Sequence, residues 1–196
     1  MLKLAEMFYS LQGEGPAAGR PAIFIRTAGC NLNCGSDVGA TWKCDTWNVM
    51  KSMKFALAPA ELVHRIGTMI PKDASLPRIV FTGGEPLLQA EDLVDSLIEI
   101  QNTFKDESYI LCDLETNGTV FNREVFDLCG GVVSVSPKLS NSMIPEDVRF
   151  KPQVLEQILE TTPFAIFKFV VSNEQDIQEI LTKYVPVLGS NWRDFT

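Results

Sequence analysis

The stretch RIVFTGGEP, residues 78–86, combines a run of β-branched and aromatic residues with two glycines that end it. Such a run predicts a buried strand at Arg78–Thr82, followed by a turn. Runs of the same kind occur on both sides of it, so the sequence predicts five strands. The other four lie at Ala22–Arg26, Tyr109–Leu114, Val132–Ser136 and Phe164–Val171.

Segments with helical spacing of apolar residues separate these runs. The first helix begins near Pro59, and the others are predicted at 90–104, 123–128, 154–160 and 174–184. Alternating strands and helices predict an α/β fold with a mostly parallel sheet and right-handed crossovers. Because five units are fewer than the eight that close a barrel, we expect an open, partial βα barrel formed by one domain over residues 1–196.

Composition and net charge indicate what kind of molecule the protein binds and where it is located. The chain is 45% hydrophobic but has no apolar run near the ~20 residues that a membrane span needs. Its N-terminus lacks the apolar stretch of a signal peptide, so we expect a cytoplasmic protein. A net charge of −8 disfavours nucleic acid as a partner and favours a small-molecule substrate.

Polar and glycine-rich segments directly follow four of the predicted strands. They are Gly29-Cys30, Thr82 to Pro86, Glu115 to Gly118, and Ser136-Pro137-Lys138. In open parallel sheets ligands bind at the carboxyl ends of the strands. We therefore expect these four segments to meet around one site.

Three of the five cysteines, Cys30, Cys34 and Cys44, lie within fifteen residues of one another. In a reducing compartment such a group indicates metal binding rather than disulfides. Three thiolates leave one iron of a [4Fe-4S] cluster without a protein ligand, and that iron can bind S-adenosylmethionine. An electron from the cluster then splits the sulfonium and yields a 5′-deoxyadenosyl radical.

The spacing C-x3-C-x9-C leaves a second possibility open. It exceeds the commonest radical S-adenosylmethionine spacing, C-x3-C-x2-C, by about seven residues at 35–41. A zinc site that is completed by Asp45 or His64 is the alternative. We expect the two remaining cysteines, Cys112 and Cys129, to be buried thiols that act as small hydrophobic residues.

The segment Gly83-Gly84-Glu85-Pro86 resembles the GGEP motif of radical S-adenosylmethionine enzymes, where the backbone meets the ammonium group of that molecule. Further segments are similar to the 7-carboxy-7-deazaguanine synthase family, and the similarity spans about residues 6–171. These segments are EMFYSLQGEGP at 6–16, FIR at 24–26, GCNL at 29–32, CDT at 44–46, ETNGT at 115–119 and VSPK at 135–138.

This resemblance implies a ring contraction in 7-deazapurine biosynthesis, for example of queuosine. In it, 6-carboxy-5,6,7,8-tetrahydropterin becomes 7-carboxy-7-deazaguanine with loss of ammonia. The radical takes the hydrogen at C6, and the product radical takes it back, so S-adenosylmethionine is regenerated. The resemblance also implies an external electron donor such as a flavodoxin or ferredoxin, and a homodimer.

The resemblance assigns site residues as well. Leu11, Gln12 and Gly13 contact the pterin, Arg26 pairs with its carboxylate and Thr82 completes that pocket. Cys30, Cys34 and Cys44 hold the cluster, and Thr46 is a ligand of Mg²⁺. The residues implied to hold S-adenosylmethionine are Lys43, Cys44, Asp45, Gly84, Asn117, Ser136, Pro137 and Lys138.

The chain departs from the family pattern in two places. Lys43 stands where many relatives have an aromatic residue for the adenine, although Trp42 and Trp47 flank it. The chain also ends at Thr196, where relatives run on into a further strand and a C-terminal segment. Two rival functions are another small radical S-adenosylmethionine enzyme, such as a glycyl-radical activase, and a non-catalytic iron–sulfur or zinc module.

Overall fold

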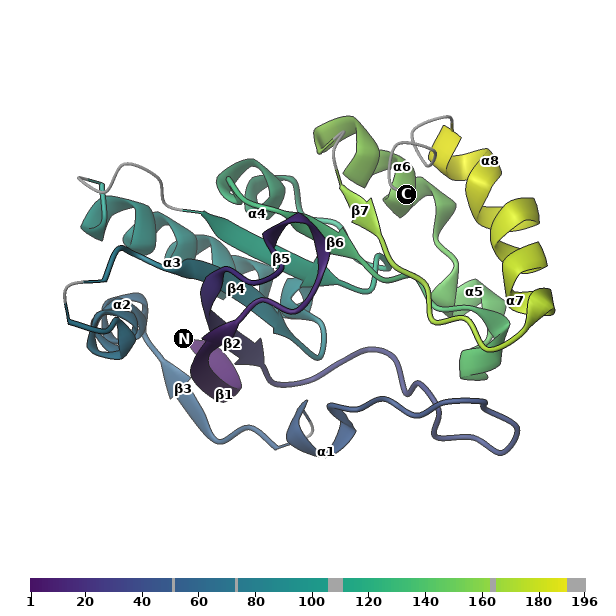
Figure 1. The fold of residues 1–196 in the computed structure, drawn as a ribbon, viewed down its shortest axis with the longest axis horizontal. Helices are drawn as coiled ribbons and strands as arrows, with labels where there is room; N and C mark the ends of the chain where they lie inside the picture. The colour runs from purple at the N-terminus through teal and green to yellow at the C-terminus, as the bar shows by residue number, and fades with distance from the viewer. Residues whose placement is uncertain (51, 73, 106–110, 163–164, 190–196) are drawn as a thin grey trace.

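A computed structural model describes residues 1–50, 52–72, 74–105, 111–162 and 165–189 of the chain. Within these ranges the strands form one open sheet in the order β3-β1-β2-β4-β5-β6-β7 (Figure 1). Their bounds are β1 (Leu2–Leu11), β2 (Pro21–Thr27), β3 (Phe55–Leu57), β4 (Arg78–Gly83), β5 (Cys112–Thr116), β6 (Val133–Val135) and β7 (Ile166–Phe167). The predicted open, mostly parallel α/β sheet is confirmed.

The prediction of five strands is wrong, because β1 and β3 were not expected. The parallel part runs from β2 to β7, with Arg26 beside Thr82 at the ends of β2 and β4. β1 pairs antiparallel with both β2 and β3. Its ten residues mix buried and exposed positions without a continuous apolar run. Such a run is the pattern that marks a strand of a buried parallel sheet, so β1 could not be recognised by it.

The last predicted strand is much shorter than expected. Of 164–171, only Ile166–Phe167 forms β7, and Phe164 lies outside the described residues. The neighbouring β6 ends at Val135, shortly before Pro137, which has no N–H for a ladder. Similarly, β5 begins at Cys112, and the predicted strand residues 109 and 110 are outside the described ranges.

The predicted helices are present with nearly the expected bounds. They are α2 (Pro59–Met69), α3 (Ala90–Thr103), α4 (Arg123–Leu128), α6 (Pro152–Thr161) and α7 (Glu174–Glu179), which continues through a π-helical turn (Ile180–Tyr184) into α8 (Val185–Leu188). α2 packs against α3, α3 against α4, α4 against α6, and α6 against α8. They form a row that follows the sheet (Figure 1).

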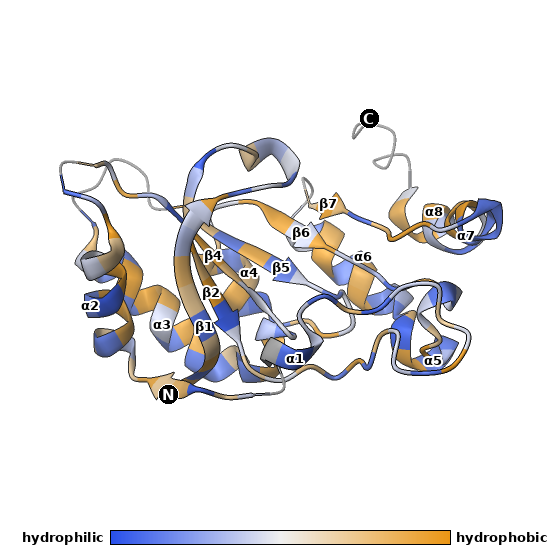
Figure 2. Ribbon diagram, turned by 60° about the horizontal axis from the view of Figure 1, so that its bottom comes forward, coloured by the Kyte–Doolittle hydropathy of each residue, from blue (hydrophilic) through white to orange (hydrophobic). Residues whose placement is uncertain are grey.

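The buried core lies between the sheet and the helices, and both contribute side chains to it. Figure 2 shows apolar residues concentrated along β2, β4 and β6, whereas the helices carry both apolar and polar residues. The long segment between β2 and α1 (Trp47–Met50) extends away from this core toward α5 (Glu146–Arg149). Among the described residues, no helix is both long enough and apolar enough to cross a membrane.

Candidate active site

The carboxyl ends of β2, β4, β5 and β6 open into a cavity of about 620 Å³. Most of the predicted site residues line it. These are Gln12, Gly13, Arg26, Cys30, Cys34, Lys43, Cys44, Asp45, Thr46, Thr82, Gly84, Asn117, Ser136 and Lys138. Two others do not: Leu11 is 60% exposed on β1, and Pro137 is buried beside the cavity.

The three cysteines of the long loop line this cavity together. Cys34 is buried with Leu32 and Ile144, and Cys30 and Cys44 pack against that small apolar group. The backbone N–H of Cys44 points at the carbonyl oxygen of Cys34 over 3.4 Å. The nine residues between these two cysteines are therefore looped out, so that the second and third cysteines lie close despite their unusual spacing.

The looped-out residues are tied to the other end of the molecule through Asn141. Its side chain, 7% exposed, accepts from Trp42 Nε1 at 2.9 Å and donates to Asp176 Oδ2 at 2.9 Å and to the Val170 carbonyl at 2.8 Å. Thr41 Oγ1 also lies 2.7 Å from Ser172 Oγ. The insertion thus docks on the turn before α5 and on the start of α7, and it brings Trp42 into the cavity lining.

Burial disfavours the thiolate form of two of the cysteines that line the cavity. Burial raises the pKa of Cys34 to about 11, although Lys138 opposes this, and burial also raises the pKa of Cys30. Metal ions bind the thiolate, and their positive charge offsets the cost of burying it. Within the described residues no three His, Cys, Asp or Glu side chains are placed to hold one metal ion. In a cubane each thiolate binds a different iron, so the three cysteines fit a cluster better than a single ion.

One of the two side chains that could complete a zinc site does not lie at the cavity. His64 is exposed on α2 and is not part of the cavity lining, whereas Asp45 is. Thr46 Oγ1 lies 3.4 Å from Cys44 Sγ and faces the same cavity.

The two glycines after β4 let that strand end lie directly against the cysteine loop. The N–H of Gly84 donates to the Thr27 carbonyl at 3.2 Å, and the N–H of Glu85 donates to the Gly29 carbonyl at 2.9 Å. A methyl group on Gly84 would overlap the Gly29 carbonyl oxygen. Gly83 has φ of 122°, which favours glycine.

Glu85 joins this strand end to the next one. It is fully buried and accepts from Thr116 Oγ1 at 2.8 Å and from the N–H of Asn117 at 2.7 Å. Burial raises the pKa of Glu85 to about 7. Asn117 in turn donates to Asn31 Oδ1 at 2.9 Å, beside Cys30. The sequence did not assign Glu85 a role, and the structure shows that it joins two segments of the cavity lining.

A second set of polar side chains lines the cavity around Glu115. Thr82 Oγ1 donates to Glu115 Oε2 at 2.7 Å, and Gln12 Nε2 donates to Glu115 Oε1 at 3.3 Å. Arg26 Nε donates to Glu6 Oε1 at 2.8 Å, and its guanidinium lies 5.8 Å from the centroid of the Phe8 ring. We call Gln12, Arg26, Thr82 and Glu115 the arginine set, and Cys30, Cys34, Cys44, Trp42 and Lys138 the cysteine set.

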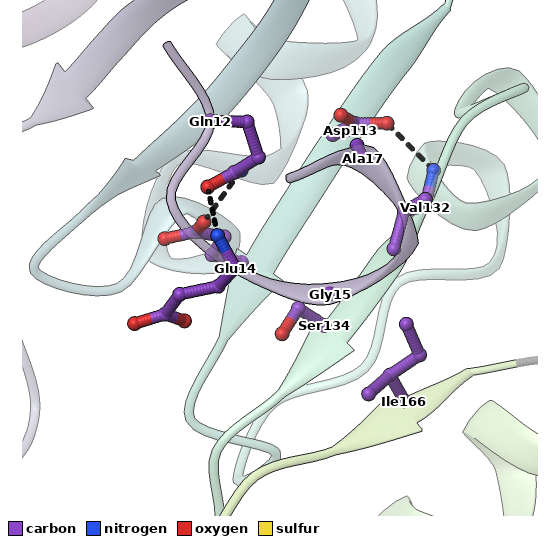
Figure 3. A pocket seen from close by; sticks show the side chains of 9 residues that line it. Gln12, Glu14, Gly15, Ala17, Asp113, Val132, Ser134 and Ile166 are labelled. Atoms are coloured by element: carbon purple, nitrogen blue, oxygen red, sulfur yellow. Dashed lines mark hydrogen bonds between the residues drawn. The ribbon is translucent and has the colours of Figure 1, made fainter. Parts of the chain in front are cut away.

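The structure adds residues to the lining that the sequence did not single out: Phe8, Glu14, Phe24, Glu115 and Lys168. Glu115 could have been recognised from the sequence, because it begins a polar segment after a predicted strand. Lys168 pairs with Glu14, and the segment from Gln12 to Ala17 curves over β5 and β6 (Figure 3). Beneath that segment a cavity of about 20 Å³ also touches Glu115, and it has room for about one water.

Comparison with known proteins agrees with this geometry. Residues 11–159 match the family described as 4Fe-4S single cluster domain. The chain is 31% identical to 7-carboxy-7-deazaguanine synthase of Clostridium acetobutylicum, in an alignment that covers 93% of this chain and 75% of that protein. The chain belongs to the 7-carboxy-7-deazaguanine synthase family.

Other members support the assignment. The relative from Hyperthermus butylicus is 35% identical, with 96% of this chain and 73% of that protein aligned. The crystal structure of QueE from Escherichia coli aligns with a TM-score of 0.61 at 28% identity, covering 96% of this chain and 78% of that chain. The family's fold therefore extends over nearly the whole chain.

Proposed function

We propose that this chain converts 6-carboxy-5,6,7,8-tetrahydropterin to 7-carboxy-7-deazaguanine with loss of ammonia, using a [4Fe-4S] cluster and S-adenosylmethionine. One observation carries the proposal. A single cavity is lined by three cysteines of one loop and by a cation, an amide and a carboxylate at the neighbouring strand ends, Arg26, Gln12 and Glu115. Membership of the 7-carboxy-7-deazaguanine synthase family supports the same reaction.

The cysteine set would hold the cluster and S-adenosylmethionine. When bound, they supply a 5′-deoxyadenosyl radical that takes the hydrogen at C6 of the pterin. Cys30, Cys34 and Cys44 would be the thiolate ligands. Lys138 Nζ donates to Ser136 Oγ at 2.8 Å and lies 5.7 Å from the centroid of the Trp42 ring. Around the cofactor this chain would also use Lys43, Asp45, Gly84, Asn117 and Pro137.

The arginine set would bind the pterin. A guanidinium can donate to both oxygens of a carboxylate, so Arg26 suits the substrate's carboxylate. Its Nε donates to Glu6, and the residue belongs to the cavity lining. Glu115 accepts from Thr82 and Gln12 and can accept from the amino groups of a pterin ring.

Thr46 is our candidate ligand for Mg²⁺, because it lines the cavity and its hydroxyl lies beside Cys44. Mg²⁺ usually takes few ligands from the protein and the others from water and substrate, so one hydroxyl can be its protein ligand. An external flavodoxin or ferredoxin, a homodimeric state and a cytoplasmic location stay predictions. So does the role of Leu11, which is exposed and does not belong to the cavity lining.

Anaerobic turnover tests the proposal. Reconstituted protein is given reductant, S-adenosylmethionine, Mg²⁺ and 6-carboxytetrahydropterin, and the products are followed by mass spectrometry. We expect 7-carboxy-7-deazaguanine without net consumption of S-adenosylmethionine. If 5′-deoxyadenosine accumulates while the pterin is untouched, the substrate assignment is wrong.

A further inference from the structure

The segment Ser136–Ser140 has two sides with different partners. The side chains of Ser136 and Lys138 line the cavity. The backbone at Lys138 and Ser140 faces a buried group of side chains from α5 and from α7 with the π-helical turn that continues it, which we call the C-terminal helix. This group consists of Arg149, Glu179 and Tyr184, which we call the anchor.

The anchor is hydrogen-bonded to the backbone of this segment at two points. The carbonyl oxygen of Lys138 accepts from Tyr184 Oη at 2.7 Å and from Arg149 Nη1 at 3.2 Å. Two residues on, the N–H of Ser140 donates to Glu179 Oε2 at 2.8 Å. The anchor therefore fixes both ends of Lys138–Ser140, directly behind the lysine side chain that faces the cavity.

The anchor is itself buried and charged. Arg149 is 4% exposed and Tyr184 is fully buried. Arg149 Nη1 lies 2.6 Å from Glu179 Oε1, and Arg149 Nε donates to the Ile144 carbonyl at 3.1 Å. Burial raises the pKa of Tyr184 to about 12, so its hydroxyl stays protonated and remains a donor. A buried ion pair of this kind adds little net stability compared with apolar packing, so its presence calls for another explanation.

We propose that Arg149, Glu179 and Tyr184 are positioning residues for S-adenosylmethionine, which hold Ser136–Lys138 in the conformation that binds it. This inference rests on the proposed function. It makes the C-terminal helix part of the cofactor site, although the helix itself does not line the cavity. If this segment could take other conformations, only the molecules with the binding-competent one would bind S-adenosylmethionine. The observed affinity would then fall in proportion to the fraction of such molecules.

Tyr184→Phe tests the proposal, because it removes one hydroxyl and keeps the ring between Phe150 and Phe169. Binding of radiolabelled S-adenosylmethionine to the reconstituted full chain is measured by equilibrium dialysis, and the pterin KM is measured in parallel. We expect the dissociation constant for S-adenosylmethionine to rise about fivefold, with the pterin KM unchanged. Without any ligand, hydrogen exchange of the Ser140 amide should become faster.

Ile180→Val is the matched control, since Ile180 packs in the core from the same helix and takes no part in the anchor. It should lower the melting temperature yet leave both the dissociation constant and the Ser140 exchange as in the wild type. The proposal is overturned if Tyr184→Phe behaves like this control. If the wild-type chain binds no S-adenosylmethionine, the proposed function fails first, and this inference falls with it.

Discussion

The cysteine set and the arginine set line one cavity but differ in how complete they are without a ligand. In the arginine set the polar side chains already have partners, as in the contacts of Glu115 with Thr82 and Gln12. In the cysteine set burial raises the pKa of Cys30 and of Cys34, so their thiolate forms are disfavoured until a cation lies beside them. We infer that binding of the cluster completes the cysteine set. Binding of the substrate, in contrast, must replace existing hydrogen bonds in the arginine set.

The largest expected effect follows from removing a cluster thiol. Cys44→Ser should abolish iron binding and lower turnover at least about a thousandfold, because neither Cys112 nor Cys129 belongs to the cavity lining and could complete the set. Iron and sulfide analysis, with turnover, measures this. Cys129→Ala is the control, since Cys129 is buried outside the cavity. An iron content near that of the wild type in Cys44→Ser would show that this thiol is not a ligand.

Gly84→Ala should disrupt the cysteine set through its backbone. The added methyl would overlap the Gly29 carbonyl, which forces the cysteine loop away from β4 and costs about 3 kcal/mol of unfolding free energy. Denaturant titration measures the loss. Gly67→Ala is the matched control, because Gly67 lies in α2 with open space around it and should gain up to about 1 kcal/mol. Equal stability of both variants would contradict the close packing at Gly84.

Arg26→Ala should damage the arginine set alone. We expect the pterin KM to rise about a hundredfold, as for the loss of a charged hydrogen-bonded pair, while the cluster absorbance stays intact. Steady-state kinetics on reconstituted protein tests this, and Arg123→Ala, in an exposed ion pair with Asp127, serves as the control. Loss of the cluster absorbance in Arg26→Ala would mean that the two sets are not separable.

The smallest expected effect concerns the insertion at 35–41 and Trp42, the residue directly after it. Trp42→Phe removes the N–H that donates to Asn141 and should speed removal of iron by a chelator about fivefold, as for one lost hydrogen bond. Val38→Ser changes a residue of the same insertion that is 98% exposed and should have no effect. If both variants lose iron at the wild-type rate, the docking of Trp42 does not stabilise the cysteine set.

The sequence predicted the parallel strands, because short apolar runs mark buried strands, and it located the cavity at the edge where the polar segments after them meet. The family resemblance, not these patterns, supplied lining residues such as Gln12, Gly13 and Arg26. The sequence could not predict β1, whose residues become a strand only by pairing with β2 and β3. Nor could it predict the anchor or the docking of Trp42. Those contacts join residues that are far apart in the chain, such as Lys138 with Tyr184 and Trp42 with Asn141.

The most direct test of the central claim is electron paramagnetic resonance of the anaerobically reconstituted, reduced protein before and after S-adenosylmethionine is added. We predict about four irons per chain and a cluster signal that changes when the cofactor binds the iron without a protein ligand. A chain that carries zinc or no metal, or a cluster signal that does not respond to S-adenosylmethionine, would contradict the account.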